Sequence, residues 1–381
     1  MIKYVSSWLL VASTLALVFP NIAEAEQSPT EDLEQRGSVI VFPKFMQGTL
    51  TIDNQKRPLT EIEVRARCPR SATCPSSEPV KIRFHWVCPG SNDIATKFVC
   101  NASGFEISVP LDGKVSFNPE DPNLAENPVV SAPCPRGYLI GRVVDATTNR
   151  PIKYDALSGG ATLRESGGRV ETYQAIVIRA EPNLASGAEI TTDADPRTGS
   201  PALVFDGAAG HYQALGATIP SNLEFHKLPG ALSSERASLI LLTLDVRLNR
   251  PNYPTFVEFD FRSDQNVGAS TSRNFTCWAE ISKPNIDEYF TLAGIRTRSG
   301  VVLSGRAVKV PFGDISDIPG PVILLGLVPT DEEGKNQSMD PVYVIQNFEK
   351  VRLGRAARSM NPADIARWSA GKPISVLVPL D

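Results

Sequence analysis

In many short segments of this chain, hydrophobic residues recur at every second position, which is the period of β-strands. Residues 61–67 alternate charged and apolar side chains without a break, and residues 80–88 repeat the pattern. Such alternation is typical of a sheet with one face in water and the other in the core. We therefore predict an all-β protein, with further strands at residues 39–42, 49–53, 105–109, 114–117 and 137–144.

Turn residues between these segments indicate how the strands connect. Asp112-Gly113 is a strong hairpin signal and predicts that the strands on either side of it pair with each other. Residues 151–157 are the expected hairpin partner of the strand at residues 137–144. About seven strands between residues 38 and 160, with a turn every ten to twenty residues, fit an immunoglobulin-like sandwich.

The second half of the chain repeats this rhythm, which we interpret as an internal duplication. The apolar residues 237–246 correspond to the opening strand of the first half, and the alternating residues 255–262 correspond to residues 61–67. The predicted fold is therefore two immunoglobulin-like β-sandwich domains. Further correspondences are expected at residues 275–278, 321–327 and 342–345.

The segment between the halves is expected to extend the first sandwich or to bridge the two. Its strands are predicted near residues 173–179, 202–205 and 211–215. Helix is rare in this sequence. Two short helices are expected, one over residues 285–293, which begins with a capping box, and one over residues 361–369, which has proline at its start.

The N-terminus has the pattern of a secretory signal peptide. Lys3 supplies a positive charge, residues 8–19 are almost all apolar, and Ala23-Glu24-Ala25 fits a small-residue cleavage site. An uncleaved anchor is the alternative, but the apolar run of about a dozen residues is shorter than the roughly 20 that span a bilayer. We expect cleavage after Ala25 and a mature protein that is secreted or periplasmic, without insertion into a membrane.

The predicted organisation has four parts. Residues 1–25 are the signal peptide, residues 26–37 a flexible leader, residues 38–232 the first β-sandwich with its extension, and residues 233–381 the second β-sandwich. An apolar content of 42% is too high for a disordered chain. A chain of 381 residues is also long enough to bury cores of this kind.

The charge pattern does not favour binding to nucleic acid. The formal net charge is −4 and neither sign dominates a long run, whereas nucleic-acid binding favours clustered lysine and arginine. The one basic stretch is interpreted as a solvated face or a helix end; it contains Lys350, Arg352, Arg355 and Arg358. No motif points to a cofactor, so none is expected.

The six cysteines are expected to form disulfides, because an even number of cysteines in an exported chain favours that interpretation. A zinc site is the alternative, but the sequence lacks the closely spaced pairs that are typical of structural zinc ligands. Spacing favours two local bridges and one that joins the halves: Cys68 with Cys74, Cys88 with Cys100, and Cys134 with Cys277.

Four segments carry a resemblance to a known group of proteins. They are residues 39–45 (VIVFPKF), 84–89 (FHWVCP), 137–141 (GYLIG) and 151–159 (PIKYDALSG). Together they resemble segments of an uncharacterised family of secreted bacterial immunoglobulin-like β-sandwich proteins. The resemblance implies the fold and export, and it carries over no catalytic residue.

Only three histidines are present, which limits the possible catalytic sites. His85 lies in an alternating segment and is interpreted as a strand residue. His211 follows a glycine-rich turn and is the best single candidate for a general base, with Asp206 as the carboxylate that would orient it. No Gly-x-Ser-x-Gly elbow supplies a nucleophile, so we assign no catalytic residue.

Asp193 and Asp195 form a weak candidate for a metal site. Two carboxylates two residues apart in a turn resemble the start of a calcium-binding loop. The distal glutamate of such a loop is missing, and Arg197 adds charge of the wrong sign. A turn rich in aspartate and closed by Gly199 is the alternative interpretation.

These observations favour a secreted, non-enzymatic binding or structural protein of the cell surface or extracellular space. Its expected partner is a protein or glycan at the cell surface, contacted through the long loops near Ser91, Asn123 and Asp195. This expectation follows from fold-level analogy. The alternative is an exported hydrolase or carbohydrate-active enzyme, which a site with His211 beside Asp206 and a serine would favour.

Overall fold

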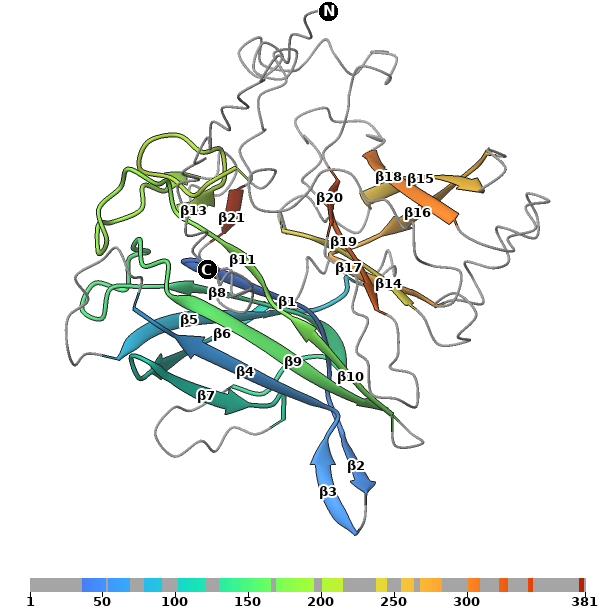
Figure 1. The fold of residues 1–381 in the computed structure, drawn as a ribbon, viewed down its shortest axis with the longest axis horizontal. Helices are drawn as coiled ribbons and strands as arrows, with labels where there is room; N and C mark the ends of the chain where they lie inside the picture. Colours follow the sequence, from blue (N-terminus) through green and yellow to red (C-terminus); the bar gives the residue numbers. More distant parts are fainter. Residues whose placement is uncertain are drawn as a thin grey trace, which may run out of the picture. The chain divides into compact units, whose positions relative to one another are not determined.

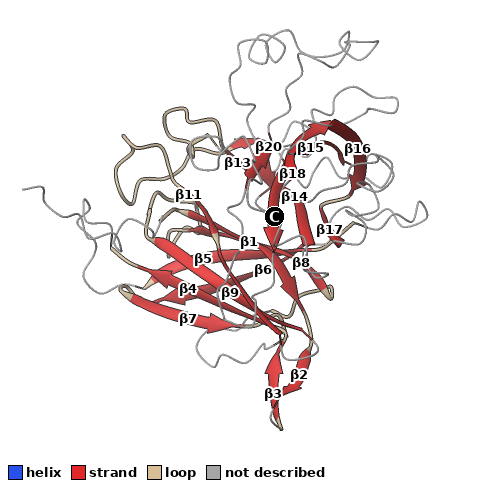
Figure 2. Ribbon diagram, turned by 45° about the vertical axis from the view of Figure 1, so that its right-hand side comes forward, coloured by secondary structure: helices blue, strands red, loops and turns tan. Residues whose placement is uncertain are grey.

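The computed structural model describes the chain in separate stretches, and all regular secondary structure in them is β-strand (Figures 1 and 2). The all-β prediction is therefore confirmed for these stretches. The signal peptide and the helices expected at residues 285–293 and 361–369 lie outside them. The described residues are 36–52, 54–68, 79–90, 102–120, 130–165, 169–194, 201–214, 238–244, 255–263, 268–282, 301–308, 322–327, 342–344 and 377–379.

Two antiparallel sheets in the first part of the chain pack face to face (Figure 1). Side chains from both sheets contribute to one hydrophobic core. The five-stranded sheet has the order β11 (Ile176–Ile178), β1 (Val39–Met46), β8 (Arg136–Val143), β5 (Val80–Val87) and β6 (Ala102–Val109). The four-stranded sheet has the order β10 (Arg169–Gln174), β9 (Leu157–Glu165), β4 (Thr60–Ala66) and β7 (Gly113–Phe117).

The alternating segments form strands with one wet face. In β4, Ile62 and Val64 are buried, whereas the charged residues beside them are partly or fully exposed. β5 repeats this alternation from Val80 to Trp86. The prediction that these strands turn one face to the core and the other to water is confirmed.

β1 differs because both of its faces are buried. Residues 39–42 are each 0% exposed, although successive side chains of a strand point to opposite faces. One face packs on the four-stranded sheet, where a Cβ atom added to Gly159 of β9 would lie 3.1 Å from the ring of Phe42. Residues from later segments, among them Tyr212 and Ile240, join the same hydrophobic cluster. The continuous apolar run thus marks a strand that is covered on both sides.

The turn at Asp112-Gly113 forms, but the predicted hairpin is wrong. The N–H of Gly113 donates to the carbonyl of Pro110 at 3.0 Å, yet β6 and β7 belong to different sheets. Asp112 has a φ of 56°, and Leu111 before it has no positive φ. A type I′ hairpin turn needs positive φ at both central residues, so this turn instead carries the chain from one sheet to the other.

The second predicted hairpin forms only at its turn. The N–H of Asp145 donates to the carbonyl of Arg150 at 2.8 Å. After the turn, only an isolated bridge joins Val144 and Pro151, and a proline at that point has no N–H to donate to a ladder. The chain then enters the other sheet at Leu157, where β9 begins.

Between the halves, β10 and β11 extend the two sheets of the first part, which is one of the two roles expected for this segment. The single strand expected near residues 173–179 is divided at Ala175 between these two strands. The prediction of a strand at residues 211–215 is wrong for the residues of this range that the structure describes. Tyr212 instead makes isolated bridges to Ala180 and Phe205. β12 (Asp193–Ala194), β13 (Pro201–Val204) and β21 (Leu377–Pro379) form a small sheet.

The later half contains two further antiparallel sheets. The strands expected at residues 237–246, 255–262, 321–327 and 342–345 are confirmed where the structure describes them. One sheet has the order β17 (Trp278–Ser282), β14 (Ser238–Thr243), β19 (Val322–Leu327) and β20 (Val342–Val344). The other has the order β16 (Gly268–Phe275), β15 (Thr255–Ser263) and β18 (Val301–Val308).

Cys88 and Cys134 form a disulfide with their Cα atoms 5.9 Å apart. Cys88 follows β5 and Cys134 precedes β8, and these strands are neighbours in the five-stranded sheet. The predicted bridges from Cys88 to Cys100 and from Cys134 to Cys277 are therefore wrong. Pairing of the two strands brings together cysteines that are 46 positions apart in the sequence.

The other described cysteines are also oxidised. Cys68 and Cys277 are disulfide-bonded, and none of the described cysteines is a free thiol. Cys74 and Cys100 lie outside the described residues, so the expected bridge between Cys68 and Cys74 stays a prediction.

Replacing both Cys88 and Cys134 by alanine should lower the free energy of unfolding by about 2–4 kcal/mol, since the bridge restricts the unfolded chain. Urea denaturation of the oxidised proteins measures the difference. Peptide mapping of the unreduced wild type should yield a disulfide-linked pair that contains Cys88 and Cys134. Recovery of Cys88 linked to Cys100 would contradict the structure.

Candidate functional site

β1 contains a bulge that turns a charged side chain into the protein. The pairing of β1 with β8 shifts register between Phe42 and Phe45, where Pro43 has no N–H to donate to a neighbouring strand. The N–H of Lys44 donates instead to the hydroxyl of Tyr173 at 3.3 Å. Bulges re-aim side chains, and here Lys44 is left only 2% exposed.

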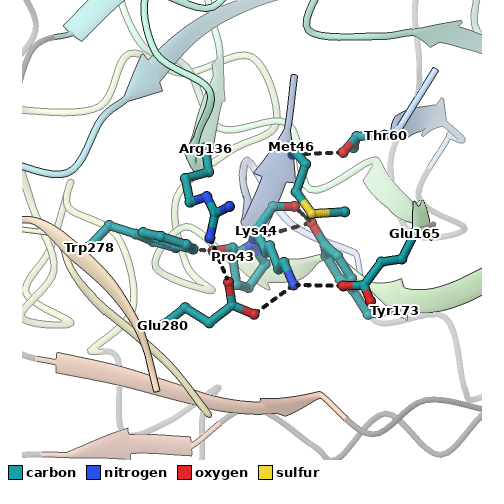
Figure 3. Close-up of polar contacts among 9 residues, drawn as sticks. All are labelled: Pro43, Lys44, Met46, Thr60, Arg136, Glu165, Tyr173, Trp278 and Glu280. Carbon is teal, nitrogen blue, oxygen red and sulfur yellow. Dashed lines mark hydrogen bonds and ion pairs between the residues drawn. The ribbon is translucent and has the colours of Figure 1, made fainter. Parts of the chain in front are cut away.

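Carboxylates from two distant strands surround the Lys44 ammonium (Figure 3). Its Nζ lies 2.7 Å from Oε1 of Glu280 on β17 and 3.9 Å from Oε1 of Glu165 on β9. The other carboxylate oxygen of Glu280 lies 3.6 Å from Nη1 of Arg136. Since moving an ion out of water costs several kcal/mol, the close carboxylate is what stabilises an ammonium at this depth.

Two buried aromatic residues hold the backbone of the bulge in place. Nε1 of Trp278 donates to the carbonyl of Pro43 at 2.8 Å, and the hydroxyl of Tyr173 donates to the carbonyl of Lys44 (Figure 3). Buried carbonyls without a partner are costly. These bonds therefore stabilise the bulge and fix where the Lys44 side chain begins.

No motif in the sequence predicts this cluster. Lys44 and Glu280 are 236 positions apart, and no local motif connects them. One local signal existed, since Pro43 and Lys44 interrupt an otherwise apolar segment. A proline and a charged residue are both out of place in a central strand, and together they indicate a bulge with a special role.

The structure does bring together the predicted His–Asp pair. Nδ1 of His211 lies 2.8 Å from Oδ1 of Asp206, and the two side chains are 15% and 22% exposed. The same oxygen accepts the N–H of Ala208 at 2.9 Å. In the part of the chain that the structure describes, no serine, threonine or cysteine side chain hydrogen-bonds to the His211 ring. The pair closes a turn and lacks a described nucleophile.

His85 is a strand residue, as predicted. It lies on β5, and its Nε2 is 3.1 Å from Nη1 of Arg142 on the neighbouring β8. A Cβ atom on Gly104 of β6 would lie 3.1 Å from the His85 ring, so glycine leaves room for it there.

The metal hypothesis stays a prediction, because Asp195 lies outside the described residues. Asp193 is exposed at the start of β12. No group of three or more metal-binding side chains occurs among the residues with a described position. The loops near Ser91 and Asn123 and the basic residues 350–358 also lie outside the description.

β2 (Thr49–Ile52) and β3 (Gln55–Pro58) form a hairpin. The sequence predicts the first of these strands but not the second. The hairpin pairs with no other described strand and stands off both sheets in Figures 1 and 2. None of its described residues is buried, and Lys56 and Arg57 are exposed. Asn54, with a φ of 60°, supplies the conformation that a tight turn needs. This asparagine was the local signal for the hairpin.

Comparisons with known proteins do not extend this picture. No protein-family model, no curated protein and no solved structure matches the chain. Among the residues that the structure describes, no helix is long and apolar enough to cross a membrane. The candidate sites therefore rest on the geometry of this chain.

Tyr173 and Tyr212 should stay protonated above pH 10 for as long as the protein is folded. Burial raises the pKa of both phenols above the ordinary value of 10.0. The unfolded chain releases these protons near the ordinary pKa while the folded chain keeps them. The contribution of the two phenols to the free energy of unfolding is therefore fully present below the ordinary pKa. Above it, the free energy of unfolding falls by about 1.4 kcal/mol per pH unit for each phenol.

Absorbance titration of the phenolates checks this expectation. Tyr173 and Tyr212 should ionise only together with unfolding. In a variant with Tyr173→Phe and Tyr212→Phe, that late step should disappear. Ionisation of every tyrosine near pH 10 in the folded wild type would contradict the burial of these rings.

Proposed function

We propose that this protein is a secreted, non-enzymatic binding or structural protein of the cell surface or extracellular space, and that the β2–β3 hairpin is its contact arm. The exposure of this hairpin is the observation that carries the proposal. Its described residues are all at least partly exposed, and among the described strands β2 and β3 pair only with each other.

The hairpin has the properties of an arm that meets a partner. Isolated two-stranded hairpins are at best marginally stable in water. The base of this one is closed by a 2.8 Å hydrogen bond from the N–H of Leu59 to the carbonyl of Gly48. Gly48 has a φ of 133°, and a Cβ atom there would lie 2.8 Å from the Leu59 side chain. No other described strand pairs with either edge of the ribbon, which leaves the edges available to a partner strand among the residues that the structure describes.

Charge favours an anionic glycan as that partner. Lys56 and Arg57 are successive strand residues, so each face of the ribbon carries one cation. Thr51 and Gln55 add hydrogen-bonding groups. Cations of this kind pair with the carboxylate or sulfate groups of acidic sugars. A surface protein that adds a strand to the ribbon is the alternative partner.

Other features support export and the finer architecture. A disulfide such as Cys88–Cys134 persists in oxidising compartments, which fits the signal-peptide pattern. We propose that residues 38–232 and 233–381 are immunoglobulin-like sandwiches related by duplication, within the secreted bacterial family that the sequence resembles. The pairing of β14 with β19 corresponds to that of β1 with β8, which supports this relationship.

An exported hydrolase or carbohydrate-active enzyme is the second candidate. The 2.8 Å contact between His211 and Asp206 favours it, because an oriented histidine is the usual general base. No described serine, threonine or cysteine side chain hydrogen-bonds to the His211 ring, so its nucleophile is unassigned.

The enzyme hypothesis is tested with chromogenic p-nitrophenyl esters and glycosides. We expect the purified wild type to hydrolyse none of them above the background rate. Hydrolysis by the wild type that is lost in His211→Gln, with the fold retained, would replace the binding proposal by the enzymatic one.

The binding hypothesis is tested on an array of sulfated, uronic-acid and neutral glycans. The variant with Lys56→Gln and Arg57→Gln should bind acidic glycans about two- to thirtyfold more weakly, since each of the two exposed ion pairs contributes about 0.2–1 kcal/mol. Wild-type binding should also weaken as salt is added.

The matched control removes two other exposed cations by Lys114→Gln and Arg150→Gln, whose side chains are 60% and 64% exposed. It should bind like the wild type. Equal losses in the two variants would point to the overall charge and not to the hairpin. Absence of any glycan binding would contradict the proposed partner.

A further inference from the structure

We propose that Lys44 and Glu280 condense to an intramolecular amide bond, which ties β1 to β17. The proposal rests on the geometry of the Lys44 cluster and is independent of the hairpin. It assigns a covalent modification to a place where an amine, a carboxyl group and two accessory charged groups converge (Figure 3).

The two reacting groups are held in contact and away from water. Nζ of Lys44 lies 2.7 Å from Oε1 of Glu280, and the two side chains are 2% and 17% exposed. The bulge and its hydrogen bonds with Tyr173 and Trp278 fix the backbone that carries the amine. Groups held in this way react as if present at about 10⁵–10⁸ M. Such an effective concentration accelerates the condensation, and burial limits the access of water that would reverse it.

The reaction needs one proton transfer before the bond forms. The Lys44 ammonium passes a proton to the Glu280 carboxylate that it already touches, which leaves a neutral amine and a carboxylic acid. The nitrogen lone pair then attacks Cδ of Glu280, so that the C–N bond forms and one carboxyl oxygen becomes an oxyanion. Arg136, at 3.6 Å from Oε2, is placed to stabilise that oxyanion.

Glu165 is placed to move the remaining protons. Its Oε1 lies 3.9 Å from the Lys44 nitrogen, within reach of a proton relay once the side chains adjust. Its carboxylate takes a proton from the attacking nitrogen and delivers it to the departing hydroxyl. The C–O bond breaks, one water leaves, and Glu165 returns to its carboxylate form. No oxidant, reductant or cofactor is required.

The product would be a second kind of covalent tie in this chain. The Cys88–Cys134 disulfide joins neighbours within one sheet, whereas the amide would join strands of different sheets that are 236 positions apart. Unlike a disulfide, an amide resists reduction. A secreted binding or structural protein would keep its β1–β17 contact in a reducing or mechanically stressed environment.

Intact mass measurement of the exported protein, after reduction and alkylation of its cysteines, tests the proposal. We expect a mass lower by one water than that of the uncondensed chain with the same N-terminus. Proteolysis should release a branched peptide in which the Lys44 peptide is joined to the Glu280 peptide. A full-mass wild type without a branched peptide would overturn the proposal.

Variants separate the amide from a simple ion pair. Lys44→Arg keeps the positive charge but should give the full mass and no branched peptide. Glu280→Gln should still condense, with loss of ammonia in place of water. Glu165→Gln should leave a larger uncondensed fraction shortly after synthesis. A loss of one water that persists in Lys44→Arg would place the condensation elsewhere and overturn the assignment.

The Lys114–Glu63 pair provides a matched control. It has the same 2.7 Å separation, but the Lys114 side chain is 60% exposed. Lys114→Arg should therefore leave both the mass deficit and the branched peptide unchanged. If this substitution abolished the deficit, contact alone and not burial would govern the reaction, and the assignment to Lys44 would fail.

Discussion

The burial of β1 on both faces is the constraint on which the described structure depends. The strand pairs with β8 and β11 within its sheet, packs through Phe42 on β9, and shares its core with Tyr212 and Ile240 from later segments. Removal of apolar surface from water is the dominant favourable term in folding. A strand that loses all exposure therefore organises the segments that cover it.

This central position explains why the polar features of β1 are unusual. Pro43 breaks the ladder, and the resulting bulge brings a lysine to 2% exposure. An ammonium at this depth is tolerated only with a partner, and Glu280 supplies it at 2.7 Å. The first part of the chain and β17 are thereby linked by charge as well as by apolar packing. Whether the link is ionic or covalent depends on the loss of a single water.

The described polar residues divide into internal and external roles. The His211–Asp206 pair closes a turn that carries the buried Tyr212, and the Lys44 cluster joins strands. The β2–β3 hairpin makes no strand pair with the sheets and presents cations to solvent. The proposed contact arm belongs to the external group, whereas the two buried clusters serve the fold.

Local patterns in the sequence determined β4 and β5 and the faces that they bury, because alternation at residues 61–67 and 80–88 records contact with core or water. The apolar run at residues 39–42 also marked a strand, and the residues beside His211 placed it next to Asp206. Only the tertiary structure decided the partners. Asp112-Gly113 makes its turn but changes sheets, Cys88 pairs with Cys134, and Lys44 meets Glu280. These contacts depend on backbone pairing and burial between segments far apart in the chain, which no local pattern encodes.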